Sequence, residues 1–106
     1  MDYKMKLEAF RALVEANQRQ RHESVYTHPF DNHASVKPGA KYDKVNVGTS
    51  GRYMVEVRTG NIFGIKGYGK PHKGHFYGTL DTITDYFWGN YYPEKLVMTY
   101  APEGML

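Results

Sequence analysis

The sequence predicts an α+β domain in which an N-terminal amphipathic helix packs on a small antiparallel β-meander, with a short second helix as one interpretation of a later segment. Three observations predict this class. Apolar residues recur at helical spacing in residues 1–21, apolar and polar residues alternate within residues 41–100, and the 106-residue chain suits a single hydrophobic core. We expect one domain, with residues 22–40 as an irregular connector.

The helix is predicted from Asp2 to about Arg21. Its apolar positions lie three and four residues apart and therefore share one face: Tyr3, Leu7, Phe10, Leu13 and Val14. Arg11 with Glu15, and Glu15 with Arg19, stand four residues apart, which allows ion pairs across one turn. No glycine or proline interrupts the segment.

The connector is rich in turn-forming residues, at His28-Pro29-Phe30, Asp31-Asn32-His33 and Lys37-Pro38-Gly39. It is long for a loop inside a compact domain. Two alternatives remain open. Either the connector forms a functional arm, or part of it packs on the domain through its apolar residues Val25, Tyr26 and Phe30.

Three strands of a meander are predicted at Lys41–Val47, Arg52–Arg58 and Asn61–Lys66. The second strand has the period-two pattern, with its apolar positions at Tyr53, Val55 and Val57.

Thr59 and Gly60 are expected to form a two-residue hairpin loop, since glycine accepts positive φ. Such a loop pairs Val57 with Ile62, Glu56 with Phe63 and Met54 with Ile65.

A glycine-rich stretch leads to a fourth strand candidate at Gly74–Thr79. Leu80–Trp88 is expected to form a short helix or a turn that buries some of its apolar residues, and Thr82 with Asp85 resembles a capping box. A last strand is predicted at Lys95–Tyr100.

Composition narrows the biological setting. The chain has no cysteine, which excludes a disulfide framework and a thiolate zinc site, and it shows neither a signal peptide nor an apolar run of membrane-spanning length. We therefore expect a cytoplasmic protein without membrane insertion. The formal charge of +3 and the pI near 9.1 favour acidic partners.

The strongest local pattern lies between Lys66 and Tyr77. Lysines, histidines and aromatic residues alternate there with glycines, and we interpret the stretch as a flexible loop. Cations that contact phosphates and rings that stack on bases are typical of single-strand binding surfaces. The candidate binding residues are Lys66, Tyr68, Lys70, His72, Lys73, His75, Phe76 and Tyr77. The alternative is a solvated hairpin loop whose tyrosines cover the core.

Neither a metal site nor catalysis is predicted, and no cofactor is expected. His28 with His33 and His72 with His75 have no carboxylate at a fixed spacing, and the spacing of the second pair is expected to separate its rings on a regular strand. The glycines follow neither the dinucleotide nor the P-loop order, and no nucleophile elbow or carboxylate pair is present. We expect a non-enzymatic protein.

The segments Lys41–Val55 and Thr59–Gly69, continued by Gly78–Ile83, resemble small accessory proteins encoded by tailed bacteriophages. The similarity covers about the central half of the chain, judged at single-domain size, and leaves the helix and the tail unmatched. It implies expression in the cytoplasm of an infected bacterium, and it implies no functional residues.

Two functions follow as hypotheses. The first is nucleic-acid binding, with single strands favoured, through Lys66–Tyr77. The second is inhibition of a host protein, such as a defence component or a polymerase, through the same aromatic surface, because Tyr, Trp and Arg are favoured at protein interfaces. Salt dependence separates the two, since phosphate contacts weaken steeply with salt. The sequence does not specify an oligomeric state.

Overall fold

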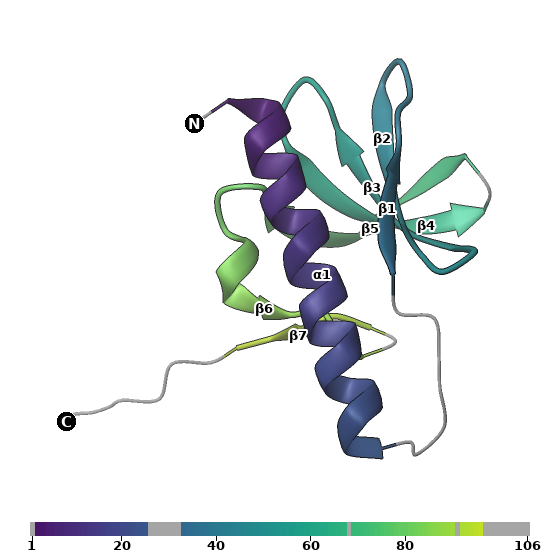
Figure 1. Ribbon diagram of the computed structural model, residues 1–106. Coiled ribbons are helices and arrows are strands. Elements are labelled where there is room, and N and C mark those ends of the chain that lie inside the picture. Colours follow the sequence, from purple (N-terminus) through teal and green to yellow (C-terminus); the bar gives the residue numbers. More distant parts are fainter. Residues whose placement is uncertain (1, 26–32, 68, 91, 97–106) are drawn as a thin grey trace, which may run out of the picture.

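The structure is a computed structural model that describes residues 2–25, 33–67, 69–90 and 92–96, with the side chains of residues 22–25 left out. One long helix, α1 (Tyr3–Val25), packs on a five-stranded antiparallel sheet in which the strands follow chain order (Figure 1). The elements after the helix are β1 (Ala34–Lys37), β2 (Tyr42–Val47), β3 (Ser50–Glu56), β4 (Asn61–Gly67), β5 (Lys70–Thr79), the 3-10 helix η1 (Ile83–Asp85), β6 (Tyr86–Phe87) and β7 (Glu94–Lys95). Strands β6 and β7 form a separate small sheet. The predicted α+β fold is confirmed.

Helix α1 uses the predicted apolar stripe and continues four residues beyond Arg21. Leu7, Phe10 and Val14 are buried, whereas the other two stripe residues are half-buried against the same core. The side chain of Asp2 begins the helix by accepting the backbone N–H of the third helical residue at 2.9 Å. Burial of this stripe supplies the main packing energy of the helix.

The predicted ion pairs of α1 are present, and one of them also holds a strand. Arg11 and Arg19 lie 3.1 and 3.2 Å from Glu15. Glu15 also accepts the backbone N–H of Ala34 at 2.9 Å, and Arg11 donates to the Ala34 carbonyl at 3.1 Å. Helix α1 thus binds both backbone groups of the first residue of β1.

The prediction of an irregular connector is wrong at its two ends. Residues 22–25 continue α1, and Ala34–Lys37 form the edge strand β1, in which Ala34 pairs with Val47 and Val36 with Val45. The partner strand and the helix stabilise this short segment, which lies between two stretches of turn-forming residues. The packing predicted for Val25, Tyr26 and Phe30 involves side chains outside those that the structure describes.

The β3–β4 hairpin forms with a different register from the predicted one. Tyr53 pairs with Gly64, and Met54 with Phe63. The predicted partners are wrong because the connection contains four residues, closed by the N–H of Gly60, which donates to the Glu56 carbonyl at 2.7 Å. Gly60 does adopt the expected positive φ, at +79°.

The register also decides which residues of β3 are buried. Tyr53 and Val55 face the helix as predicted, but Val57 lies in the turn and is 39% exposed. Met54 is buried on the opposite face, where it pairs with Phe63.

The chain after β4 agrees with the prediction only in part. Strand β5 begins at Lys70, four residues before the predicted start. The predicted short helix or turn at Leu80–Trp88 is confirmed as the 3-10 helix η1, with Leu80 and Trp88 buried, but β6 follows it within the same segment. The prediction of a capping box is wrong, because the Thr82 side chain makes no capping hydrogen bond. Its hydroxyl oxygen instead accepts the backbone N–H of Thr79 at 3.0 Å. The last strand is Glu94–Lys95, and residues 97–100 lie outside the described residues.

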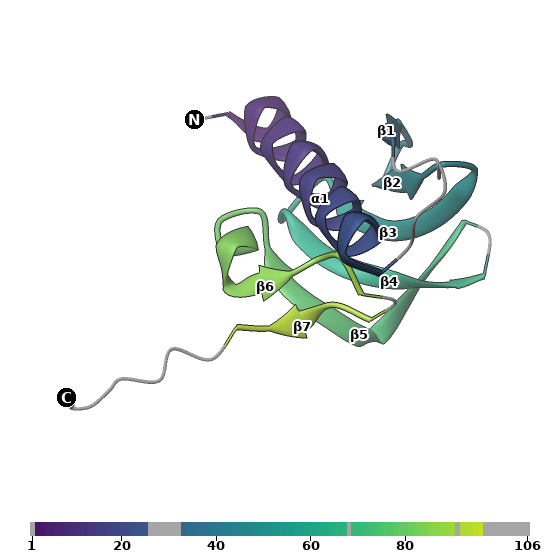
Figure 2. The ribbon, with the colours of Figure 1, turned by 60° about the horizontal axis from the view of Figure 1, so that its bottom comes forward.

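Trp88 lies at the centre of the core and joins the helix to the small sheet. It is fully buried, with its ring 4.8 Å from Phe10 and 5.2 Å from Tyr53. Its backbone N–H donates to the Asn17 side chain at 2.9 Å, and its carbonyl accepts from Gln18 at 2.7 Å. These contacts hold β6 beneath α1, at one end of the large sheet (Figure 2).

Candidate functional site

The predicted binding stretch is a β-hairpin and not a flexible loop. Lys66 is near the end of β4, and Lys70–Tyr77 belong to β5. Tyr68 lies outside the described residues. Antiparallel pairing with β4 therefore fixes the backbone of most of this stretch, and the prediction of a loop is wrong.

The hairpin divides the predicted residues between two faces of the sheet. Tyr77 faces the helix side, where its ring lies 6.2 Å from that of Tyr53. Phe76 faces the opposite side, 5.6 Å from the ring of Phe63, and the Lys73 ammonium lies 5.7 Å from the same ring. Because side chains alternate along a strand, the predicted residues cannot form one continuous surface.

His72 and His75 are stacked. Their ring centroids lie 3.9 Å apart, with the planes only 3° from parallel. A bulge causes this arrangement, because the neighbouring β4 residues Phe63 and Gly64 pair with Phe76 and His72. The expectation that the spacing separates the two rings is wrong, because it assumes a regular strand.

Glycine makes room for the histidine pair. A Cβ atom added at Gly64 would lie 3.1 Å from the Cβ of His75, and one added at Gly74 would lie 3.1 Å from the His72 ring. Both distances are shorter than an ordinary van der Waals contact. A larger residue at either position would therefore press on the stack.

The stacked pair is poorly arranged for a metal ion. A metal lies in the plane of each ligating imidazole, and parallel planes direct their lone pairs side by side without convergence. Among the described residues, no group of three or more His, Cys, Asp or Glu side chains could hold a metal. His28 lies outside the described residues, and His33 pairs with Glu15 at 3.1 Å beside the helix. The absence of a metal site stays a prediction.

A cleft of about 490 Å³ opens beside the histidine pair, on the helix side of the sheet. Its charged and aromatic lining comprises Arg52, Tyr53, Lys66, His72, His75, Tyr77 and Tyr92. We call this space the cleft. It includes four of the eight predicted residues and excludes Lys70, Lys73 and Phe76.

Buried polar atoms underlie the cleft. The hydroxyl of Tyr53 and Nδ1 of His72 are buried without a hydrogen-bond partner in the described part of the chain, and Nη1 of Arg52 is buried in the same wall. Unsatisfied buried polar atoms are uncommon and frequently mark functional sites. The cleft is therefore more polar than its aromatic rings alone suggest.

The phenols of Tyr53 and Tyr77 are protonated at neutral pH. Burial raises the pKa of Tyr53 well above its ordinary value, although the Arg52 guanidinium opposes this shift. Burial also raises the pKa of Tyr77, followed by the nearby phenols of Tyr92 and Tyr86. These hydroxyl groups keep their protons and can act as hydrogen-bond donors.

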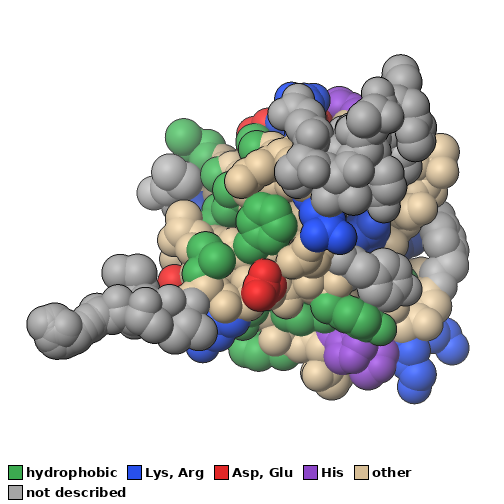
Figure 3. All heavy atoms as spheres, turned by 90° about the horizontal axis from the view of Figure 1, so that it is seen from below, with side chains coloured by type: hydrophobic (Ala, Val, Ile, Leu, Met, Phe, Trp, Pro, Cys, Tyr) green, Lys and Arg blue, Asp and Glu red, His purple; other side chains and the backbone are tan. Residues whose placement is uncertain are grey.

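The electrostatic character of the cleft is basic. Arg52 and Lys66 contribute two permanent cations, and no Asp or Glu is found among the described residues that line it. Histidine side chains lie next to Lys and Arg side chains at one edge of the molecule (Figure 3). An anion can therefore enter without meeting a carboxylate.

Distant segments complete the cleft. Arg52 is the extra residue of a bulge in β3, and Tyr92 follows β6, with its ring 5.8 Å from that of His75. The binding residues predicted from the sequence include neither Arg52 nor Tyr92. A glycine before Arg52 is a weak sequence signal for a bulge, whereas nothing local connects Tyr92 with the hairpin.

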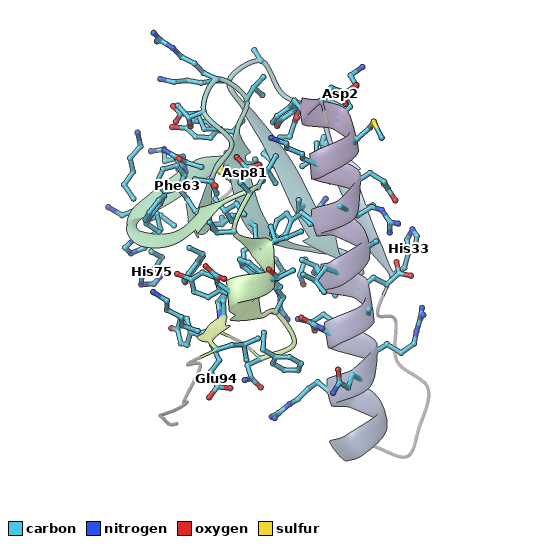
Figure 4. All side chains as sticks on the ribbon, turned by 90° about the vertical axis from the view of Figure 1, so that its left-hand side faces the viewer. Asp2, His33, Phe63, His75, Asp81 and Glu94 are labelled. Atoms are coloured by element: carbon cyan, nitrogen blue, oxygen red, sulfur yellow. The ribbon has the colours of Figure 1, made fainter. Side chains whose placement is uncertain are left out.

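His75 and Phe63 both lie away from α1, and His33 lies beside the helix (Figure 4).

No protein-family model, curated protein or solved structure matches this sequence significantly. The resemblance to bacteriophage proteins therefore stays a prediction. No helix in the described part of the chain has the length and apolar character required to span a membrane.

Proposed function

We propose that this protein binds single-stranded nucleic acid at the β4–β5 hairpin and the adjoining cleft, and that it acts as a binding protein without enzymatic activity. The observation that carries this proposal is the cleft itself, in which Arg52 and Lys66 share a wall with aromatic rings and no described carboxylate. Single-strand binding requires the same combination of cations and exposed rings.

The exposed lysines of the hairpin extend the basic surface beyond the cleft. Lys66 lies at the cleft, and Lys70 and Lys73 are exposed on β5. A flexible strand can contact lysines on both sides of a narrow hairpin, because its phosphates repeat along the chain. Each contact releases condensed counterions and makes the affinity dependent on salt.

Aromatic rings supply the second requirement of single-strand binding, a surface on which bases stack. Tyr92 is 61% exposed, and its ring meets His75 nearly at right angles. Tyr77 is half-buried at the same cleft. Stacking on such rings tolerates any base, so we expect weak sequence preference.

Fluorescence anisotropy with labelled DNA and RNA oligonucleotides tests the proposal. Alanine at both Lys70 and Lys73 should weaken binding and flatten the slope of log affinity against log salt by about 1.4 units, for two lost single-strand contacts. Alanine at both Lys4 and Lys95 removes the same charge from exposed positions on α1 and β7. This control should leave the slope nearly unchanged.

Absence of binding at low salt, where electrostatic attraction is strongest, would refute nucleic-acid binding. Binding to a protein partner, for example inhibition of a host protein, then becomes the leading candidate function. The observation that favours this second function is the outer face of the hairpin, where Phe76 is 50% exposed beside Phe63. Affinity capture that is insensitive to salt and lost in Phe76→Ala would support it.

A further inference from the structure

We infer that the cleft is a subsite for one nucleotide, which binds a phosphate through Arg52 and Lys66 and stacks its base on the ring of Tyr92. This inference rests on the proposed function and assigns a specific role to the cleft. It goes beyond general attraction of a strand to the lysines, because it requires that a mononucleotide bind by itself.

The size of the cleft fits a single nucleotide. Its volume of about 490 Å³ lies inside the range of roughly 300–1,000 Å³ that is typical of small-molecule sites. The cleft is formed by side chains from β3, β4, β5 and the segment after β6, so it encloses a ligand from several directions. A longer strand would place one nucleotide in the cleft and continue along the hairpin.

Charge and hydrogen bonding suit one end of the cleft to a phosphate group. The guanidinium of Arg52 offers paired donors that match phosphate oxygens, and the ammonium of Lys66 adds a second cation. The buried Tyr53 hydroxyl and His72 Nδ1 belong to the same lining and have no hydrogen-bond partner within the described residues. Both atoms are buried in this structure, so a polar ligand would satisfy them only after the side chains that cover them move.

The arrangement of the rings suits the other end of the cleft to a base. His75 is covered on one face by His72, with 3.9 Å between the ring centroids. Tyr92 stands nearly perpendicular to His75, at 87°, and remains largely exposed. The exposed ring of Tyr92 therefore provides a stacking surface at the edge of the cleft.

Titrations of the ¹⁵N-labelled protein with inorganic phosphate, uridine and uridine 5′-monophosphate test the inference. The monophosphate should bind more tightly than either fragment and should shift the amide signals of cleft residues. It should also displace a labelled oligonucleotide from the protein. These three probes distinguish a site for any anion, a site for any ring and a site for a whole nucleotide.

Two variants at exposed positions separate the two ends of the ligand. Lys66→Gln should weaken binding of the monophosphate and of inorganic phosphate by about fivefold, as expected for an exposed ion pair, without affecting uridine. Tyr92→Ala should weaken the monophosphate and uridine by about fivefold or more without affecting inorganic phosphate. Lys95→Gln removes an equal charge on β7 and should leave all three affinities unchanged. A matching amide spectrum shows that each variant is folded.

The outcomes separate this inference from the proposed function. If oligonucleotides bind but the monophosphate neither shifts cleft signals nor competes, the nucleotide subsite is refuted and strand binding stands. If the monophosphate binds as described but no oligonucleotide binds, the cleft assignment is supported and the proposed function is refuted. Equal binding of inorganic phosphate and monophosphate, unchanged in Tyr92→Ala, refutes the base contact and overturns the inference.

Discussion

The packing of α1 on the sheet can be tested at Phe10. This side chain is fully buried, and its ring lies 4.8 Å from Trp88 and 5.6 Å from Tyr53. Phe10→Ala removes the ring from the contact between the helix, β3 and the segment after η1. The two neighbouring rings belong to different segments of the chain, so the cavity cannot close by a small shift of one of them.

The expected loss in unfolding free energy is about 3–5 kcal/mol, which combines lost burial with the cavity that remains. A domain of this size has a total stability of about 5–15 kcal/mol. The melting temperature should therefore fall by at least about 12 °C.

Phe76→Ala provides a matched control, because it removes the same atoms from a side chain that is 50% exposed. Its cost should be about 1 kcal/mol, close to half the value of burying a phenylalanine. Thermal and urea unfolding followed by circular dichroism measure both variants. Equal losses in the two variants would show that α1 does not pack on the sheet through Phe10, and the reasoning would fail.

Three further predictions concern local contacts. Gly89→Ala should cost about 1–3 kcal/mol in urea unfolding, because the added Cβ would lie 2.5 Å from the Asn17 carbonyl oxygen and 2.6 Å from the Phe87 ring; an unchanged midpoint would contradict this close contact. The pKa of Glu15 is held below its ordinary value of 4.5, first by the hydrogen bond from the Ala34 N–H. Glu15 therefore stabilises the fold above about pH 4.5 and loses this contribution as the pH falls through its folded pKa, so Glu15→Gln should reduce the difference in unfolding free energy between pH 7 and pH 3. Stoichiometric zinc or a chelator should leave the melting temperature unchanged, since the stacked histidines do not converge on one ion; stabilisation by several degrees would refute this.

The candidate site was only partly predictable. The sequence identifies the hairpin by its lysines, histidines and aromatic residues, and His72, His75 and Tyr77 do line the cleft. The sequence cannot show that Phe76 lies on the opposite face of the sheet from the cleft, because the bulge in β5 decides which face each following side chain takes. The position of Tyr92 at the cleft cannot be predicted from the sequence either, because only the path of the chain through β6 brings it to His75.

The sequence alone determined the elements whose stability is local or periodic. The apolar stripe of α1 arises from a spacing that is visible in the local sequence, and the structure reproduces it. The predicted alternation of β3 is reproduced only in part, because Tyr53 and Val55 are buried but Met54 between them is buried as well. The ion pairs of Glu15 follow from the same helical geometry.

Tertiary structure decided the features whose free energy comes from partners far away in the chain. Strand β1 exists because β2 and Glu15 satisfy its backbone groups, and the β3–β4 register follows from packing that puts Val57 into the turn. The histidine stack likewise depends on how β5 bulges against β4. Local sequence cannot encode these contacts, because each one gains its stabilisation only after the distant partner is already in place.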